Sequence, residues 1–440
     1  MPLLVVACPG DAPVAGAKHV FLLDGRSYPK RFFEAHFDEI HLGAGVEQID
    51  ESGEIVLRLN ADGVNRLAAI NSAPVQTLFA MSSDTHVKTF MPVAAHFANP
   101  RHFVYFGDDS LAIKSLEAEG ASWERHSARM RGWHGADVMI TGNDWGTQSK
   151  LIVARARKRR IPSVIVQESI IDLDHPMGMM QWADFAIIQG PYSLRYLKRD
   201  FAFLAGNPRY DAIQRMSLPD APRAFINCNF TFNVFEDKGR GWVDDVTRAA
   251  EAAGLPYMVS LHPRCYIDMT GVKNVQPSGA YVVHEQLRAS TIVITRFSSL
   301  AHEALLMGRH VIYYNPHGET MRYLNEDATG LIEKAYNPIE LAAAIRRCMS
   351  QPAPIDREIS ASAAFDNLFC GTEGLGCARC ATAIRAIAAT RDLYLPRDFR
   401  YTPEWKLRVK IFLDESLRRA VKRVPLLSTV RKGAKRLVGR

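Results

Sequence analysis

Residues 291–316 read TIVITRFSSLAHEALLMGRHVIYYNP. An apolar, β-branched run over Thr291–Thr295 ends in the polar turn Arg296-Phe297-Ser298-Ser299, and a short helical pattern follows over Leu300–Met307. A second apolar run, Val311–Tyr314, comes after the helix. The pattern predicts one strand–helix–strand unit of a parallel sheet, with the polar turn at the carboxyl end of its first strand.

The polar turn is suited to binding an anion. Backbone N–H groups and the dipole at the start of the helix favour negative charge there. Arg296, Ser298 and Ser299 can add hydrogen bonds to phosphate oxygens, and Glu303, one turn into the helix, can accept hydrogen bonds from sugar hydroxyls. The stretch therefore predicts a site for a phosphorylated ligand that also carries hydroxyl groups.

The chain has 440 residues, 47% of them hydrophobic, which is enough for two domains with full cores. No apolar run reaches the roughly 20 residues that span a bilayer. The N-terminal MPLLVVACPGDAP has no basic leader and is expected to form a first strand. The 7 cysteines are scattered, as is typical of a reducing compartment, so we expect a cytoplasmic protein.

The net charge of +7 is concentrated at the C-terminus. Residues 401–440 carry 12 Lys or Arg against 3 acids, a balance of +9, which leaves about −2 for the rest of the chain. A general nucleic-acid-binding surface is therefore not expected. Residues 402–440 alternate apolar and basic side chains, which favours peripheral binding to the anionic inner face of the cell membrane. The alternative is that part of this tail packs back on the core.

The rest of the chain alternates short apolar runs with amphipathic helical patterns, as in an α/β protein with parallel sheets. The best boundary is the turn-rich stretch that starts at Gly206. We expect two Rossmann-like domains facing one cleft, where the carboxyl ends of both sheets would bind ligands. The expected division is residues 1–205, a linker over 206–222, a second domain over 223–390, and a basic helical tail over 391–440.

Two further strand ends carry candidate groups. In Ser260–Arg264 (SLHPR), His262 can bind phosphate or transfer a proton, and Arg264 offers a planar guanidinium to phosphate. In the first domain, Asp144 and Glu168 follow successive strands and are candidates for a general base or for binding an acceptor. The alternatives are a plain structural turn for SLHPR, and a helix-capping role for Asn143 or Asp144.

No metal or cofactor is expected. Cys370, Cys377 and Cys380 lack a fourth zinc ligand at a recognisable spacing, so free thiols are favoured. The chain has no phosphate-loop, dinucleotide-binding or nucleophile-elbow motif, which disfavours kinase, dehydrogenase and α/β-hydrolase activities.

Several blocks together resemble bacterial capsule and surface-polysaccharide transferases related to CDP-glycerol glycerophosphotransferases, which have the glycosyltransferase-B (GT-B) architecture. The similarity runs over about residues 135–350. It rests on an ND turn followed by IPSVIVQES, on GNPRYD before the second domain, on SLHPR, and on the stretch quoted first.

The resemblance implies that His262 and Arg264 contact the donor phosphate, that Ser298 and Ser299 contact the phosphate or leaving group, and that Glu303 contacts the donor's sugar. Asp144 and Glu168 would lie on the acceptor side. This chain departs from the family in having Arg296-Phe297 before the serine pair, where relatives often carry an acid.

The expected function is transfer of a sugar or polyol phosphate from a nucleotide-activated donor, linked to CMP, CDP or UDP, to a lipid-linked or polysaccharide acceptor. Arg264 and Arg296 would neutralise the leaving phosphate without a metal. One alternative is a non-hydrolysing nucleotide-sugar epimerase. Another is a non-catalytic nucleotide-binding subunit of a polysaccharide assembly complex.

Overall fold

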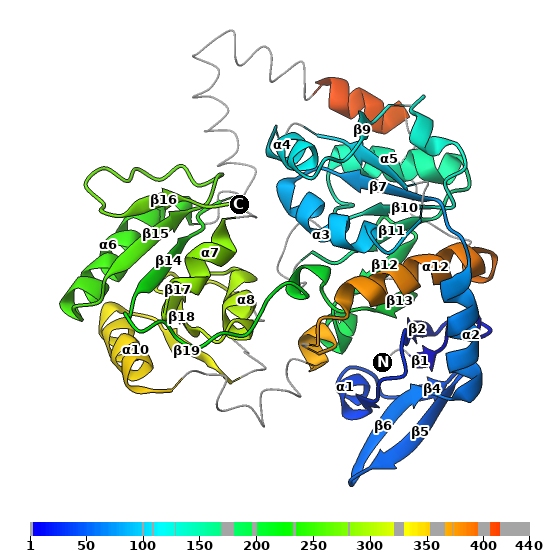
Figure 1. The fold of residues 1–440 in the computed structure, drawn as a ribbon, viewed down its shortest axis with the longest axis horizontal. Coiled ribbons are helices and arrows are strands. Elements are labelled where there is room, and N and C mark those ends of the chain that lie inside the picture. The colour runs from blue at the N-terminus through cyan, green and yellow to red at the C-terminus, as the bar shows by residue number, and fades with distance from the viewer. Residues whose placement is uncertain are drawn as a thin grey trace.

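A computed structural model gives the fold of the chain (Figure 1). The residues that the structure describes are 3–98, 101–107, 110–127, 129–168, 180–195, 200–231, 235–279, 282–320, 330–352, 366–371, 373–394 and 405–413.

The N-terminal half is built on a 10-stranded sheet in which every neighbouring pair of strands is parallel. Its inner strands are mostly apolar and buried, because helices cover the sheet. In spatial order they are β4 (Ile40–Leu42), β1 (Leu4–Ala7), β2 (Lys18–Phe21), β13 (Phe201–Leu204), β12 (Phe185–Ile188), β11 (Ser163–Val166), β10 (Val138–Thr141), β7 (Thr77–Met81), β8 (Arg101–Tyr105) and β9 (Trp123–Arg125).

The second half has a 6-stranded sheet that is also parallel throughout. Its order is β16 (Val275–Pro277), β15 (Tyr257–Leu261), β14 (Ala224–Cys228), β17 (Ile292–Thr295), β18 (His310–Tyr314) and β19 (Ile332–Ala335). The strand–helix–strand unit expected over residues 291–316 is therefore present, as β17, α8 and β18. The expected α/β fold of two parallel sheets is confirmed.

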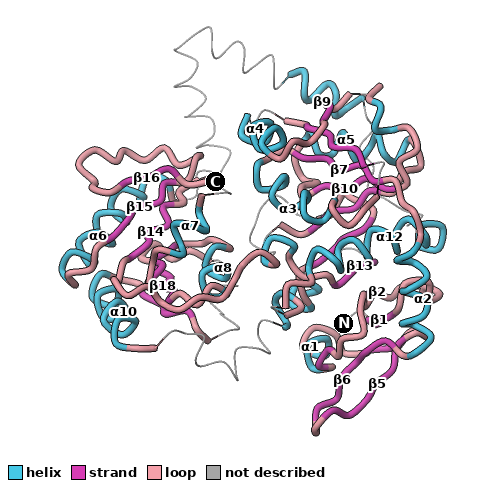
Figure 2. The backbone as a smooth tube through the Cα atoms, viewed as in Figure 1, coloured by secondary structure: helices cyan, strands magenta, loops and turns pink. Residues whose placement is uncertain are grey.

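Helices pack around both sheets, as Figure 2 shows in cyan. They are α1 (Arg31–Glu34), α2 (Ala61–Ser72), α3 (Asp84–Ala94), α4 (Ser110–Ala118), α5 (Thr147–Lys158), α6 (Gly239–Ala252), α7 (Val283–Arg288), α8 (Leu300–Leu306), α10 (Pro338–Ser350) and α12 (Gly376–Tyr394). Short 3-10 turns follow several strands: η1 (Arg131–Trp133), η2 (Pro191–Arg195), η3 (Pro208–Tyr210) and η4 (Glu236–Lys238).

A small antiparallel sheet was not expected. It joins β3 (Tyr28–Pro29), β6 (Glu54–Leu59) and β5 (Val46–Glu51), and β5 and β6 form a hairpin. Ser52 and Gly53 form its two-residue turn with φ of 57° and 86°. Two positive φ angles in a two-residue turn match the right-handed twist of a hairpin, and the Ser-Gly pair between alternating runs is the sequence signal for it.

Helix α12 returns to the first sheet after the second has been completed. It packs against α2, α3 and β13. The carboxylate of Asp211 accepts hydrogen bonds from the backbone N–H groups of Gly376 (2.8 Å) and Cys377 (2.6 Å), which satisfies two unpaired donors at the start of the helix. The expected division places residues up to 390 with the second domain, whereas α12 packs on elements of the first half.

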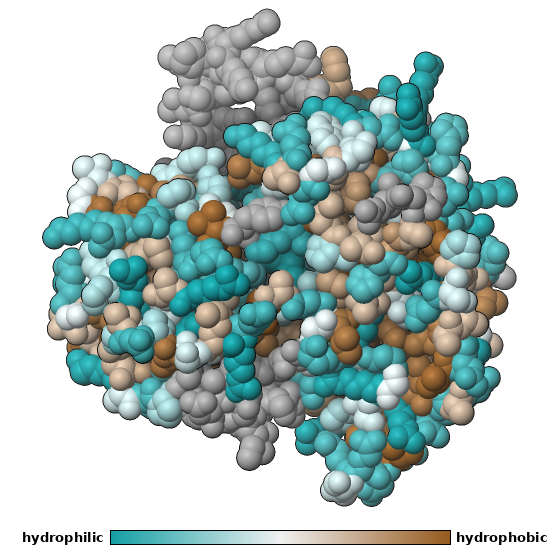
Figure 3. Space-filling model, viewed as in Figure 1, coloured by the Kyte–Doolittle hydropathy of each residue, from teal (hydrophilic) through white to brown (hydrophobic). Residues whose placement is uncertain are grey.

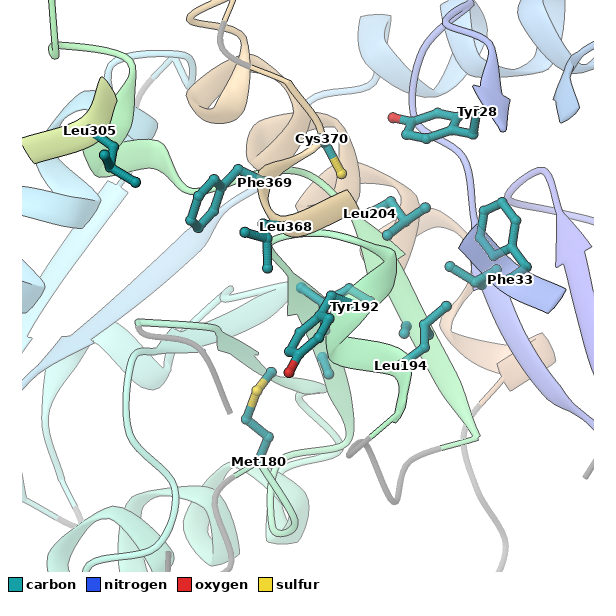
Figure 4. Packing of buried hydrophobic residues seen from close by; sticks show 14 of the residues in the cluster. Tyr28, Phe33, Met180, Tyr192, Leu194, Leu204, Leu305, Leu368, Phe369 and Cys370 are labelled. Atoms are coloured by element: carbon teal, nitrogen blue, oxygen red, sulfur yellow. The ribbon is translucent and has the colours of Figure 1, made fainter. Parts of the chain in front are cut away.

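One buried cluster runs through both halves. It includes Leu204 of the first sheet, Leu305 of α8, and Leu368 and Phe369 of the segment that precedes α12. Figure 4 shows Phe369 lying between Leu305 and Leu368. Apolar packing therefore continues from one half to the other through the returning chain.

Residues 405–413 form a last helix that packs on α5, through Leu407 against Leu151 and Ala154. This helix is red-orange in Figure 1. The remainder of the expected tail, residues 414–440, lies outside the described residues. In the part of the chain that the structure describes, no helix is both long and apolar enough to cross a membrane.

Candidate functional site

Glu168 lies two residues after β11, at the carboxyl edge of the first sheet, with about a quarter of its side chain exposed (26%). Its Oε2 lies 3.3 Å from Nε2 of His86, a residue of α3 that is 2% exposed. Burial alone would raise the pKa of Glu168, but His86 and the charges of Arg209 and Arg264 hold that pKa below its ordinary value. Glu168 is therefore an ionised and partly accessible carboxylate at neutral pH.

Asp144 is fully buried, and its carboxylate is used by the backbone. It accepts hydrogen bonds from the N–H groups of Met180 (3.0 Å), Trp182 (2.7 Å) and Ala183 (2.9 Å). These contacts fix the segment that leads into β12. Neither Asp144 nor Asn143 caps α5, whose N-cap residue is Gly146. Oδ1 of Asn143 accepts hydrogen bonds from Trp145, Gly146 and Ser149 and so orders the turn before the helix. We therefore give Asp144 a supporting role and leave it out of the groups proposed to react.

His262 and Arg264 lie in the loop after β15, His262 partly buried and Arg264 exposed. Nδ1 of His262 accepts the backbone N–H of Arg264 at 3.1 Å. Burial, together with the nearby charge of Arg264, lowers the pKa of His262. The imidazole is thus neutral at pH 7 with its proton on Nε2, as a hydrogen-bond donor.

Ser298 and Ser299 are both half-buried in the turn between β17 and α8. The Oγ of Ser298 accepts the backbone N–H of Leu300 at 3.2 Å, so the hydroxyl proton can be donated elsewhere. Ser299 is the N-cap residue of α8 and makes no capping bond with its side chain. Both hydroxyls are therefore placed at the carboxyl edge of the second sheet, as expected.

Arg296 is fully buried, which sequence reasoning did not predict. Its Nε donates to Glu319 Oε1 at 2.6 Å, and its Nη1 donates to the carbonyl oxygen of Asn229 at 3.0 Å. The guanidinium carbon lies 4.1 Å from the ring centre of Phe230 and 4.5 Å from that of Phe297. Because its guanidinium is buried and engaged by these groups, Arg296 stabilises the turn that carries Ser298 and Ser299. We do not place it among the phosphate ligands.

Glu303 is 1% exposed and lies between two cationic or proton-donating groups. Its Oε1 accepts from Nη2 of Arg209 at 2.6 Å, and its Oε2 lies 2.7 Å from Nε2 of His284 on α7. The Nζ of Lys88, on α3 of the first half, lies 3.3 Å from Nδ1 of His284. Glu303 thus lies within a chain of polar contacts between the two halves, with both of its oxygens engaged by protein groups.

Four of the predicted residues therefore lie at the junction of the two halves: Glu168, His262, Arg264 and Glu303. Glu168 of the first half is within electrostatic reach of Arg264 of the second, and Asp84 at the start of α3 acts likewise on His262. Sequence reasoning missed His86, Arg209 and His284. Of these, Arg209 stands in the recognised GNPRYD block and so had a signal, whereas the two histidines had none.

Within the described residues, no group of three or more His, Cys, Asp or Glu side chains is arranged to hold a metal ion. All 7 cysteines are free thiols and buried.

No model of a known protein family matches the sequence, and no curated protein matches it. Solved structures do match the fold. A protein from Listeria monocytogenes, assigned as a UDP-N-acetylglucosamine 2-epimerase, is 14% identical with a TM-score of 0.53, covering 75% of this chain and 100% of its own. The UDP-GlcNAc 2-epimerase of Methanocaldococcus jannaschii, solved with UDP-GlcNAc and UDP, is 11% identical with a TM-score of 0.51, covering 70% and 100%.

The wall teichoic acid polymerase TagF is 13% identical, with a TM-score of 0.49 over 73% of this chain and 91% of its own. At these identities the likeness is one of fold. The chain has the GT-B fold: two Rossmann-like halves, each built on a parallel sheet.

Proposed function

We propose that the protein is a transferase that moves a sugar or polyol phosphate from a nucleotide-activated donor to a lipid-linked or polysaccharide acceptor in surface glycan biosynthesis. One observation carries the proposal: an ionised Glu168 from the first sheet lies within electrostatic reach of the SLHPR loop of the second. A general base on one side and phosphate-binding groups on the other are what acid–base-assisted group transfer requires.

On the donor side, four groups are proposed to contact the phosphate that bridges nucleotide and transferred group. Arg264 is exposed and cationic, His262 presents Nε2–H, and Ser298 and Ser299 add hydroxyl donors. As the bond to the leaving nucleotide breaks, negative charge grows on its phosphate. Donors already fixed in place stabilise that charge without reorganising, which accelerates the step.

On the acceptor side, Glu168 takes the proton. The acceptor hydroxyl oxygen forms its new bond to the donor carbon or phosphorus while its proton passes to the Glu168 carboxylate. Binding both substrates between the two halves makes the reaction effectively intramolecular. The donor is expected to carry CMP, CDP or UDP.

The surface of the helix of residues 405–413 favours the proposal that the acceptor is bound to a membrane. Leu407 turns inward, whereas Trp405 (62% exposed), Val409 (50%), Phe412 (64%) and Leu413 (59%) lie on the surface. Lys406, Arg408 and Lys410 alternate with them. Apolar side chains that enter the acyl boundary, next to cations that meet anionic headgroups, are typical of peripheral helices. We propose that the protein acts from the cytoplasm on the inner face of the cell membrane. Figure 3 shows hydrophilic and hydrophobic residues intermixed over the visible face of both halves.

A nucleotide-sugar epimerase remains the second candidate, since two of the similar folds are structures of UDP-GlcNAc 2-epimerases. An epimerase converts its substrate without an acceptor and has no need of an exposed apolar and basic helix. A non-catalytic nucleotide-binding subunit is the third candidate, and it would bind nucleotide without ever releasing it from a donor.

Thermal-shift measurements with CMP, CDP, UDP and GDP test the donor side first. A nucleotide that binds the folded state raises the melting temperature by mass action, and at 100 times its Kd the gain is about 2.7 kcal/mol. We expect nucleotides of one base class to raise the melting temperature, and we expect Arg264→Ala to abolish that increase. No stabilisation by any nucleotide would contradict the proposal.

A further inference from the structure

His86 and Glu168 come from strand ends that are not neighbours in the sheet. His86 follows β7 and Glu168 follows β11, and β10 lies between these two strands. With strands about 4.8 Å apart, the imidazole must reach across the turn that follows β10 to meet the carboxylate. That turn begins at Gly142.

Gly142 leaves the space that the imidazole occupies. A Cβ added there would lie 2.6 Å from Cδ2 and 2.7 Å from Nε2 of His86, well inside van der Waals contact. Every other residue type would push the ring away from Glu168. Two separate strand ends are therefore shaped around this one contact.

The hydrogen bonds of His86 fix its tautomer. The backbone N–H of Ser82 lies 3.1 Å from Nδ1, and since an N–H group can only donate, Nδ1 carries no proton. The backbone N–H of His86 itself donates to Oγ of Ser83, the N-cap residue of α3, at 3.2 Å, which fixes the start of the helix. The proton of the neutral ring is thus on Nε2, and it points to Glu168.

We propose that His86 is a positioning residue: its Nε2–H group holds Oε2 of Glu168 so that the carboxylate faces the acceptor hydroxyl. The inference rests on the proposed function, in which Glu168 is the base. His86 does not itself touch the acceptor. It acts as the third group that orients a catalytic base, on the opposite side from the reacting hydroxyl.

Kinetics of two His86 variants test this role. His86→Ala is expected to lower kcat about 100-fold with little change in donor KM, because a misplaced base costs that much. Arg209 and Arg264, which also lower the pKa of Glu168, both remain in the variant. Losing the His86 bond raises the pKa of Glu168, so the acid limb of the kcat/KM profile should move to higher pH. His86→Gln, which keeps an N–H donor, should recover part of both changes.

Gly142→Ala tests the same contact without touching either partner. It should displace the ring and shift the acid limb as His86→Ala does. Gly146→Ala, four residues along the same turn, is the matched control, since a Cβ there meets its nearest neighbour at 3.4 Å. The proposal would be overturned if the acid limb of the kcat/KM profile did not move in His86→Ala or in Gly142→Ala. It would also be overturned if His86→Gln lost as much kcat as His86→Ala.

A second measurement does not depend on any transfer activity. In protein with ¹⁵N-labelled histidine, the His86 ring, assigned by its disappearance in His86→Gln, should give the signals of an Nε2–H tautomer that change in Glu168→Gln. An Nδ1–H tautomer, or signals that ignore Glu168→Gln, would refute the positioning role. If the tautomer is as expected and no donor is turned over, the proposed function fails and the His86–Glu168 contact stands.

Discussion

Nη2 of Arg209 donates a hydrogen bond of 2.6 Å to Oε1 of Glu303, and the pair joins the segment between the two sheets to a helix of the second. Glu303 was expected to bind the donor's sugar. Its second oxygen is held by His284, which in turn contacts Lys88 of the first half. Because both oxygens of Glu303 interact with protein groups, the carboxylate holds these elements together. Its ionised form therefore contributes to the free energy of unfolding.

Glu303→Gln should destabilise the fold by about 3 kcal/mol at pH 7. Burial alone would raise the pKa of Glu303, but Arg209, His284 and Lys88 bring it to about 2. Because the folded pKa lies below the ordinary value, the ionised group stabilises the protein fully above about pH 4.5. That stabilisation is lost as pH falls toward 2. Urea unfolding of both proteins at pH 7, 5 and 4 should show a difference that shrinks only at the lowest pH.

Glu285→Gln is the control for this prediction, because Glu285 is an exposed residue of α7 that pairs with Arg288 on the surface. It should change the unfolding free energy by less than about 1 kcal/mol. Equal effects of the two substitutions on the unfolding free energy would contradict a stabilising role for the buried interactions of Glu303.

Arg296→Ala should lower the unfolding free energy and leave the donor KM little changed. Removing the guanidinium leaves Glu319, whose pKa burial already raises, without its closest cation. A buried carboxylate that loses its partner costs about 3–5 kcal/mol. The unfolding free energy measures this, and a double variant, Arg296→Met with Glu319→Gln, should recover part of the loss. Unchanged stability with a raised donor KM would instead return Arg296 to the phosphate site.

His262→Ala, and separately Ser298→Ala with Ser299→Ala, should abolish most transfer while the protein stays folded. Each variant removes hydrogen-bond donors to the leaving phosphate, and a loss of one such donor costs about 100- to 1000-fold in kcat. Circular dichroism and melting curves check the fold. His134→Ala, at an exposed histidine, is the control and should turn over normally. Near-normal turnover in either site variant would remove these residues from the mechanism.

Trp405→Glu with Phe412→Glu should weaken binding to vesicles of anionic lipid at least tenfold, since two large apolar side chains no longer enter the membrane. Wild-type binding should also fall as salt rises, because it depends on cations. Co-sedimentation measures both. Ile339→Glu, at an apolar residue of α10 that is 82% exposed, is the matched control. Equal losses in the two variants, or no binding by the wild type, would contradict membrane docking through this helix.

Periodicity predicted the two parallel sheets well, since strands such as β10 and β17 are unbroken apolar runs that end in polar turns. Periodicity could not predict which polar side chains form hydrogen bonds or ion pairs within the protein. Asp144 and Arg296 stand at the expected strand ends, yet backbone amides and Glu319 occupy them. Nor could sequence show His86, because its partner is 82 residues away and reached across another strand. Local patterns specify elements, whereas the state of a polar group depends on contacts made only after folding.

The most direct test of the proposed transfer is release of nucleotide from an activated donor. The full chain would be mixed with CMP-, CDP- and UDP-linked donors, with and without anionic vesicles that carry a lipid-linked glycan acceptor. We predict that one class of nucleotide is released only when the acceptor is present, and that Glu168→Gln abolishes the release. Conversion of a nucleotide sugar to its epimer without acceptor, or binding with no release under any condition, would contradict the account.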